Sequence, residues 1–336
     1  MGSDTAIEWC DHTFNPWWGC QRVSPGCEHC YAEAFAKRVG FNNRSQTADG
    51  QGPIRAPLPL LWGPGSAHRF FGEKHWAEPL KWNEKAKRDG VRRRVFCASM
   101  ADVFEDREDL VEPREQLWDL VARTEHLDWL VLTKRPENIA RMIPWGPLGT
   151  HRADPKCWWN VWLGTTAEDQ QRADERIPEL LTTPAAVRFV SYEPALGAVD
   201  FARISRNSQG LSIQALVKDG FTMPDKPWAM CQVYEHPALD WIIVGGESGR
   251  GARPFDVEWA RSTVAQCKAA GVACFVKQLG AKPFDSMQHV RVDVRSKQAL
   301  TSNHLSLKDR KGGDMSEWPE ELRVRQFPEQ EGEAAA

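Results

Sequence analysis

One pattern recurs through the middle of the chain: a short apolar run, then a polar or glycine-containing motif, then a helix-like stretch. Most of the runs are rich in β-branched and aromatic residues, as strands buried on both faces of a sheet are. The six runs cover residues 94–100, 128–133, 160–165, 187–192, 240–245 and 272–277. Helix-like stretches lie between them, for example at 109–125, 168–181 and 258–270. This alternation predicts an α/β fold with a parallel sheet.

Six such units and an N-terminal strand near residues 14–18 predict a partial TIM barrel of about six to seven parallel βα units. A doubly wound open sheet is the alternative, but it usually carries a phosphate-binding fingerprint after its first strand, and this chain has none there. The barrel is expected to span residues 1–280, with insertions at 41–90 and 201–238. Residues 281–336 are expected to form a C-terminal extension with a disordered tail.

Composition narrows the function classes. No apolar run approaches the roughly 18 residues of a membrane helix, so no membrane association is expected. The first residues lack the basic and apolar regions of a secretory signal, which predicts a cytoplasmic protein. The net charge of −3 gives no global attraction to nucleic acid, so any such binding needs a local basic patch.

Three clustered cysteines are the most specific chemical signal. The chain has nine cysteines, and an odd number argues against a disulfide framework. Cys20, Cys27 and Cys30 form a C-x6-C-x2-C loop, residues 19–31, ahead of a helix-like stretch, and three thiolates on one loop indicate a soft-metal site. An iron–sulfur cluster on three cysteines leaves one iron open to a ligand, and this interpretation is favoured. A structural zinc site normally needs a fourth ligand. The candidates for it are Cys10, His12 and His29.

Polar residues follow most of the predicted strands, where parallel α/β folds collect their chemistry. Such residues in isolation are often helix caps or solvated turns, but their repetition predicts one deep polar site. They include Ser99, Asp102, Lys134, Arg135, Thr165, Glu168, Glu193, Glu247 and Lys277. Lys277 ends a buried run and is expected to meet a carboxylate or an anionic ligand. Gly245 and Gly246 are expected to let a ligand approach the backbone closely.

The three cysteines followed by Tyr31, ahead of a series of βα units, resemble the radical S-adenosylmethionine superfamily, although its commonest spacing is C-x3-C-x2-C. The chain also resembles an uncharacterised phage-associated family with a three-cysteine motif, over about residues 6–280. The segments that carry this resemblance are IEWCDHTFNPWWGC, FCASMADVFED, LTKRP, VWLGTTAED, SYEPALG, WIIVGGESGRGARP and FVKQLG.

The superfamily resemblance implies a [4Fe-4S] cluster on Cys20, Cys27 and Cys30, whose open iron binds S-adenosylmethionine. Reductive cleavage then yields a 5′-deoxyadenosyl radical, with electrons from a flavodoxin- or ferredoxin-type donor. The resemblance places Tyr31 beside the adenine. The remaining implied cofactor contacts are Ser99, Asp102, Lys134, Thr165, Glu168, Glu193, Glu247 and Lys277, although Ser99–Asp102 does not read Gly-Gly-Glu as the superfamily's amine-binding segment does.

Two functions remain open from the sequence. The first is a radical enzyme that modifies or repairs a nucleic-acid base or nucleotide. Its support is the phage-associated resemblance and two basic stretches, 85–94 and 291–297, the first with tryptophans nearby. Within the first stretch, Arg92, Arg93 and Arg94 are the expected nucleic-acid contacts. The second function is a zinc-stabilised, non-enzymatic nucleic-acid-binding or interaction protein.

Overall fold

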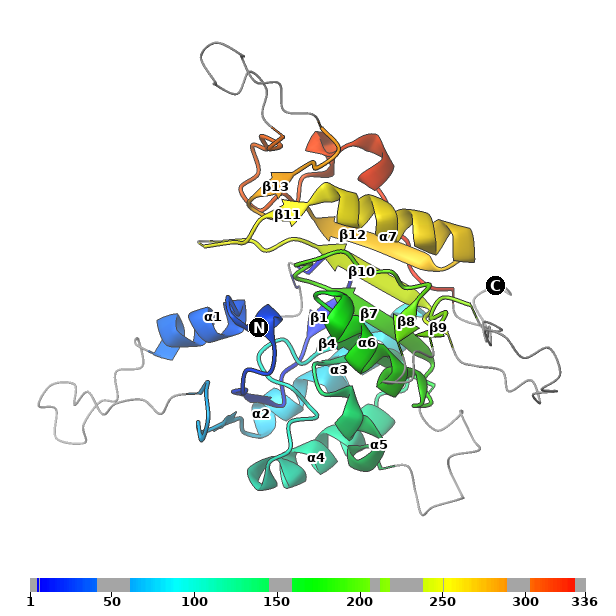
Figure 1. Cartoon of the computed structure of the whole chain (residues 1–336). Helices are drawn as coiled ribbons and strands as arrows, with labels where there is room; N and C mark the ends of the chain where they lie inside the picture. The colour runs from blue at the N-terminus through cyan, green and yellow to red at the C-terminus, as the bar shows by residue number, and fades with distance from the viewer. Residues whose placement is uncertain are drawn as a thin grey trace, which may run out of the picture. The chain divides into compact units, whose positions relative to one another are not determined.

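The computed structural model describes most of the chain. It divides into two compact units, Met1–Val161 and Trp162–Ala336, and each is described by itself. The described residues are 5, 7–40, 61–144, 159–205, 212–217, 238–249, 251–288 and 303–329. Figure 1 shows their helices and strands along the chain.

Three parallel strands form the sheet of the first unit. β4 (Arg93–Cys97) lies between β1 (His12–Thr13) and β5 (Leu127–Thr133). The β-branched and aromatic residues of β4 and β5 are buried, as the apolar runs predict. Two helices supply the connections: α3 (Glu78–Asp89) precedes β4, and α4 (Val111–Ala122) precedes β5.

The remaining elements of the first unit are short. Trp17–Trp18 (β2) pairs antiparallel with Arg69–Phe70 (β3), and α1 (Tyr31–Gly40) follows the cysteine loop. The expected strand near residues 14–18 begins two residues earlier, at β1. Pro16 cannot donate a ladder hydrogen bond, so the chain leaves the strand there and the tryptophans pair elsewhere. The other elements are η1 (Pro25–Cys27), α2 (Glu73–Trp76), η2 (Glu108–Leu110), η3 (Pro136–Asn138) and α5 (Ile139–Met142).

The strands of the second unit also pair in parallel. Their order is β6 (Val161–Thr166), β7 (Val187–Tyr192), β10 (Trp241–Gly245) and β12 (Ala273–Gln278). Helix α6 (Gln170–Leu181) connects β6 to β7, and α7 (Val257–Ala270) connects β10 to β12 and packs on both (Figure 1). Asp169 and Asp256 cap the two helices through their side chains, which accept backbone N–H bonds.

The seven parallel strands follow the order β1-β4-β5-β6-β7-β10-β12, which is their order along the chain. Each of the six predicted apolar runs overlaps a strand, and β7 has the predicted bounds. The protein is therefore a mixed α/β protein with a seven-stranded parallel sheet, consistent with the expected partial TIM-like fold. Within the described residues, no helix is long and apolar enough to cross a membrane.

The segments expected to be insertions carry little of the sheet. Residues 41–60 and most of 206–237 lie outside the described residues; the described parts hold β3, α2 and α3, and the pair β8 (Ile204–Ser205) and β9 (Ser212–Ile213). The domain boundary expected at residue 280 stays a prediction.

The C-terminal extension covers the outer edge of β12. Val276 N donates to Val324 O at 2.8 Å, and Gln326 N donates to Cys274 O at 2.8 Å. This segment therefore pairs with strand groups that would otherwise be open at the sheet edge. The extension also holds β13 (Pro283–Phe284), which pairs in parallel with β11 (Phe255–Asp256), and the short helices η5 (Met315–Glu317) and η6 (Glu320–Leu322). The tail expected to be disordered, from residue 330, lies outside the described residues.

Candidate functional site

The cysteine loop, residues 19–31, lies at the carboxyl end of β4. Gly19 N donates to Met100 O at 3.1 Å, and Gly19 forms a bridge with Ala101. Cys20 N donates to Leu61 O at 3.0 Å, which joins the loop to the segment before β3. The loop is thus held at the strand end where parallel α/β folds place their chemistry.

The three cysteines of the loop are free, half-buried thiols. Cys27 ends η1, and its sulfur lies 3.9 Å from Ser24 Oγ. Cys30 directly precedes α1 and packs against an apolar cluster that includes Trp18 and Met100. The loop therefore offers three unpaired soft donors.

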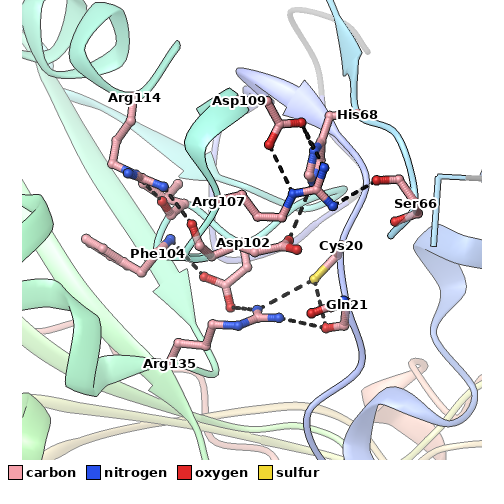
Figure 2. Close-up of polar contacts among 12 residues, drawn as sticks. Cys20, Gln21, Ser66, His68, Asp102, Phe104, Arg107, Asp109, Arg114 and Arg135 are labelled. Atoms are coloured by element: carbon pink, nitrogen blue, oxygen red, sulfur yellow. Dashed lines mark hydrogen bonds and ion pairs between the residues drawn. The ribbon is translucent and has the colours of Figure 1, made fainter. Parts of the chain in front are cut away.

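Arg135 brings a buried charge to the first cysteine (Figure 2). It follows β5, and its Nη1 lies 3.8 Å from Cys20 Sγ and 2.9 Å from Asp102 Oδ2. Its Nη2 donates to Gln21 O at 2.9 Å. Since Asp102 follows β4, residues from two neighbouring strand ends meet the loop here, as the sequence predicts for them.

The Asp102 carboxylate is occupied by protein contacts. Besides Arg135, it accepts bonds from Thr133 Oγ1 at 2.7 Å, from Lys134 N at 3.1 Å and from Phe104 N at 3.0 Å. Asp102 thus holds the turns after β4 and β5 in place, and the contact of Lys134 with it comes from the backbone.

Tyr31 and Ser99 meet beside the loop. Tyr31 OH donates to Ser99 O at 2.9 Å, while the tyrosine residue stays 60% exposed. The Ser99 hydroxyl lies 3.1 Å from Asn15 Nδ2, and Asn15 Oδ1 also accepts from Met100 N at 2.6 Å. The phenol therefore joins the start of α1 to the end of β4, and its ring is open to a planar ligand.

A buried ionic cluster next to Cys20 was not expected from the sequence. His68 Nδ1 lies 3.0 Å from Asp109 Oδ2, and Arg107 pairs with Asp109 and donates to Ser66 O (Figure 2). His68 Nε2 lies 3.6 Å from Glu105 Oε2, beyond hydrogen-bond distance. Asp109 lies in η2 and the other members lie in irregular segments, so no periodicity in the sequence links these residues.

Burial dominates the acid–base behaviour of the Cys20 thiol. Burial, together with the negative charge of Asp102, raises the pKa of Cys20 to about 12, although the Arg135 charge acts in the opposite direction. Burial alone would lower the pKa of His68. The carboxylates of Glu105 and Asp109 raise this pKa by more than burial lowers it, so it lies above its ordinary value. Without a bound metal, Cys20 is therefore a neutral thiol at neutral pH.

In the second unit, the predicted residues after β6 are buried. Glu168 is fully buried and pairs with Arg176 of α6, with Oε2 and Nη1 2.9 Å apart. Arg176 also donates to Thr166 O at 2.8 Å, and Thr165 is fully buried within β6. This pair fixes α6 against the end of its strand.

Lys277 has the carboxylate partner that the sequence led us to expect. Its Nζ lies 2.8 Å from Glu193 Oε2, so residues that follow β7 and end β12 meet. A side chain at position 245 would approach that same Glu193 oxygen to 3.3 Å. Gly245 therefore leaves room for this ion pair.

The double glycine and Glu247 form a second contact region after β10. A Cβ at position 246 would lie 2.7 Å from Leu279 O and 2.8 Å from Phe255 Cβ, so Gly246 admits the chain's own atoms, where the sequence suggested a ligand. Glu247 pairs with Arg253, whose backbone N donates to Glu247 Oε2 at 2.8 Å. The carboxylate thus joins residue 247 to residue 253.

The three arginines expected to contact nucleic acid lie at the amino end of β4, the end opposite the cysteine loop. Arg92 pairs with Asp128 and donates to Glu125 O at 2.6 Å. Arg93 and Arg94 both lie near the carboxylate of Asp11. Their charges are therefore balanced by neighbouring acids. The second basic stretch, 291–297, lies outside the described residues.

The donor set fits a soft metal group in kind, because it offers three free thiols on one loop beside a buried cation. Among the described residues, however, no group of three or more His, Cys, Asp or Glu side chains is placed to hold a metal ion. The three thiols of the loop are therefore not arranged around one metal position, and the described residues form no four-ligand zinc site either. His12 is instead buried and stacked on Trp82, and Cys10 contacts Ile7 O.

A family model described as "Protein of unknown function (DUF5131)" matches residues 4–307. The chain belongs to this family. The DUF5131 match includes the cysteine loop and every polar strand end described above, and its description gives no activity. A search of curated proteins returned no match, and neither did a search of solved structures.

Proposed function

We propose that this DUF5131 protein is a radical S-adenosylmethionine enzyme whose iron–sulfur cluster is held by Cys20, Cys27 and Cys30. The observation that carries the proposal is the position of the cysteine loop: three free thiols lie at the carboxyl end of β4, with Arg135 reaching over from β5. This is the end of a parallel sheet at which such folds bind cofactors.

A cluster held by three cysteines would supply the one-electron chemistry that cleaves S-adenosylmethionine reductively. The chain's own residues bind and orient. Tyr31 presents an exposed ring beside the loop for a flat group, and Asp102 keeps the turns of Phe104 and Lys134 in place. Electrons would come from a flavodoxin- or ferredoxin-type donor.

The substrate class we propose is a nucleic-acid base or nucleotide. Arg92, Arg93 and Arg94 are paired with acids, so they give little support for nucleic-acid binding. The support comes instead from the exposed side of α3. There Lys81, Lys85 and Arg88 recur at helical spacing, and all three are exposed. A polymer that touches these three cations loses affinity steeply as salt rises, with a log–log slope contribution of about −2 for single strands.

The test of the cluster is anaerobic reconstitution with iron and sulfide, followed by metal and sulfide analysis and by assay of 5′-deoxyadenosine after dithionite reduction. The expected result is a brown protein that loses iron in each of the variants Cys20→Ala, Cys27→Ala and Cys30→Ala. Cys10→Ala is the matched control, because this half-buried thiol lies outside the loop. A colourless protein that holds zinc would instead support the zinc-stabilised binding protein.

The test of the substrate is a fluorescence anisotropy titration with single-stranded DNA and RNA at two salt concentrations. The triple variant K81S/K85S/R88S is expected to flatten the salt dependence and to leave the iron content unchanged. If the wild-type protein binds neither polymer at low salt, the substrate is a free nucleotide or lies outside this class.

A further inference from the structure

Two exposed arginines of the first unit lie over aromatic rings. Arg69 of β3 places its Cζ 5.0 Å from the ring centre of Trp18 and 5.4 Å from that of Phe71. Arg38, in the last turn of α1, places its Cζ 5.3 Å from the ring centre of Phe35. Among the described residues, no acid pairs with either guanidinium.

The rings beneath the two arginines are in contact with one another. The ring of Trp18 meets that of Phe35 edge-on, with centres 5.8 Å apart, and that of Phe71 with centres 5.7 Å apart. Trp18 is buried, whereas Phe35 and Phe71 are partly exposed. Arg38, Arg69, Phe35, Phe71 and Trp18 therefore form one continuous patch, which we call the arginine–aromatic surface.

The arginine–aromatic surface adjoins the cysteine loop. Trp18 directly precedes Gly19, where the loop begins, and α1 follows directly after Cys30. Cys30 also packs against the same apolar cluster as Phe35 and Phe71. A ligand that covers this surface therefore lies next to the loop.

An arginine with no acid partner offers its charge and its N–H donors to a ligand. Other arginines of this unit differ, since Arg92, Arg93 and Arg135 pair with carboxylates. Guanidinium donors match the oxygens of a phosphate, and the flat faces of guanidinium groups and aromatic rings stack with nucleic-acid bases. Bases in a duplex are already stacked inside it, so a single strand is the polymer that offers both groups together.

We propose that the arginine–aromatic surface is a docking site for single-stranded nucleic acid. Phosphates lie against Arg38 and Arg69, and bases stack on the exposed parts of Phe35 and Phe71. This rests on the proposed function only in its nucleic-acid substrate, and it requires no bound metal group. The cations of α3 add phosphate contacts of their own and do not belong to this surface.

The experiment is a fluorescence anisotropy titration of the full-length protein with three labelled probes at two salt concentrations. The probes are a single-stranded oligonucleotide, the same oligonucleotide with abasic sites, and its duplex. The double variant R38Q/R69Q removes both charges, R38K/R69K keeps them without the flat guanidinium groups, and F35L/F71L keeps apolar volume without the rings. The matched control is Arg123→Gln, because this exposed arginine of the same unit pairs with Asp119 at 3.1 Å.

With R38Q/R69Q, affinity for the single strand is expected to fall about tenfold at low salt, and the log–log salt slope to flatten by about 1.4, since each phosphate contributes about 0.7 for single strands. R38K/R69K is expected to keep the salt slope and to bind less tightly than wild type. F35L/F71L is expected to weaken binding at an unchanged slope, because stacking releases no counterions. Arg123→Gln is expected to bind as wild type does, and the abasic and duplex probes are expected to bind more weakly than the intact single strand.

Equal affinities of wild type and R38Q/R69Q for the single strand overturn the inference and leave the nucleic-acid substrate standing. Equal affinities of wild type for the abasic and intact strands also overturn it, because docking then depends on phosphates alone. An equal loss in Arg123→Gln assigns the effect to general charge and overturns it as well. Wild-type protein that binds no probe at low salt overturns both the inference and the polymer substrate, and the iron analysis still tests the cluster separately. The arginine variants change exposed side chains and the abasic probe needs no variant, so the decision stands even if F35L/F71L fails to fold.

Discussion

Gly19, which directly precedes Cys20, offers a sharp test of how the cysteine loop is held. Its φ of +126° lies in a region that L side chains rarely adopt. A Cβ at this position would also meet His68 Cδ2 at 2.8 Å and Leu61 O at 3.0 Å. Gly19→Ala therefore combines backbone strain with a steric overlap against a buried ring and a backbone oxygen.

The two contributions can be separated with Gly63→Ala. Gly63 has a φ of +115°, but a Cβ there would meet no atom within 4 Å. The control is therefore expected to cost about 1–3 kcal/mol of unfolding free energy, from backbone strain alone. Gly19→Ala is expected to lower the unfolding free energy by a further ~1–3 kcal/mol because of the steric overlap. Neither the Leu61 carbonyl oxygen nor the buried His68 ring can move away easily.

The measurement is urea denaturation of the purified protein, followed by circular dichroism, with iron content as a second readout. Gly19→Ala should be clearly less stable than Gly63→Ala and should bind less iron, since any relief of the overlap moves Cys20. If the two variants have the same unfolding free energy, the close packing of the loop against His68 is refuted.

Three further variants test individual contacts. Tyr31→Phe removes the hydrogen bond from an exposed phenol to Ser99 O, so it should lower the unfolding free energy measured by urea denaturation by less than about 1 kcal/mol. The same variant lowers the affinity for S-adenosylmethionine only if the hydroxyl orients the ring. Glu168→Gln leaves Arg176 as a buried, unpaired charge and is expected to cost about 3–5 kcal/mol, with Glu175→Gln on the exposed side of α6 as the near-neutral control. The pKa of His68 is raised in the folded state, so protonated His68 stabilises the fold below about pH 6.5, and this stabilisation is lost as the pH rises through the folded pKa. His68→Asn should therefore flatten the pH dependence of the urea unfolding midpoint. An unchanged pH dependence in this variant would contradict the prediction.

The repeated apolar runs predicted the sheet well. Strands that are buried on both faces consist of nearly continuous apolar residues, and such runs can be recognised in the sequence without knowing how the strands pair. The run at 187–192 became β7 without a shift at either end. The N-terminal strand was placed two residues too late, since its aromatic residues continue past Pro16 while its hydrogen bonding does not. Trp18 packs against Ala32 and Ala36 of α1, and both tryptophans pair with β3; such long-range partners are not visible in local sequence.

The candidate site was predictable in part for the same reason. Residues at strand ends, such as Asp102 and Arg135, are fixed by the sheet, so their meeting followed from the strand order. The His68–Glu105 contact joins two irregular loops, and no periodicity links such positions. Arg92 to Arg94 appeared as a basic patch because sequence shows charges along the chain but not the acids that face them in space.

The polar strand ends differ from the open set of ligands that the sequence suggested, because their carboxylates are already paired. Asp102 pairs with Arg135, and three pairs in the second unit show the same arrangement: Glu168 with Arg176, Glu193 with Lys277, and Glu247 with Arg253. A simple ion that displaced one partner would leave the other charge enclosed and uncompensated, which is costly. A ligand that carries both an amine and a carboxylate can instead satisfy both members of a pair. The methionine end of S-adenosylmethionine carries those two groups, so the charge balance of these strand ends is compatible with the proposed cofactor and disfavours a simple anion.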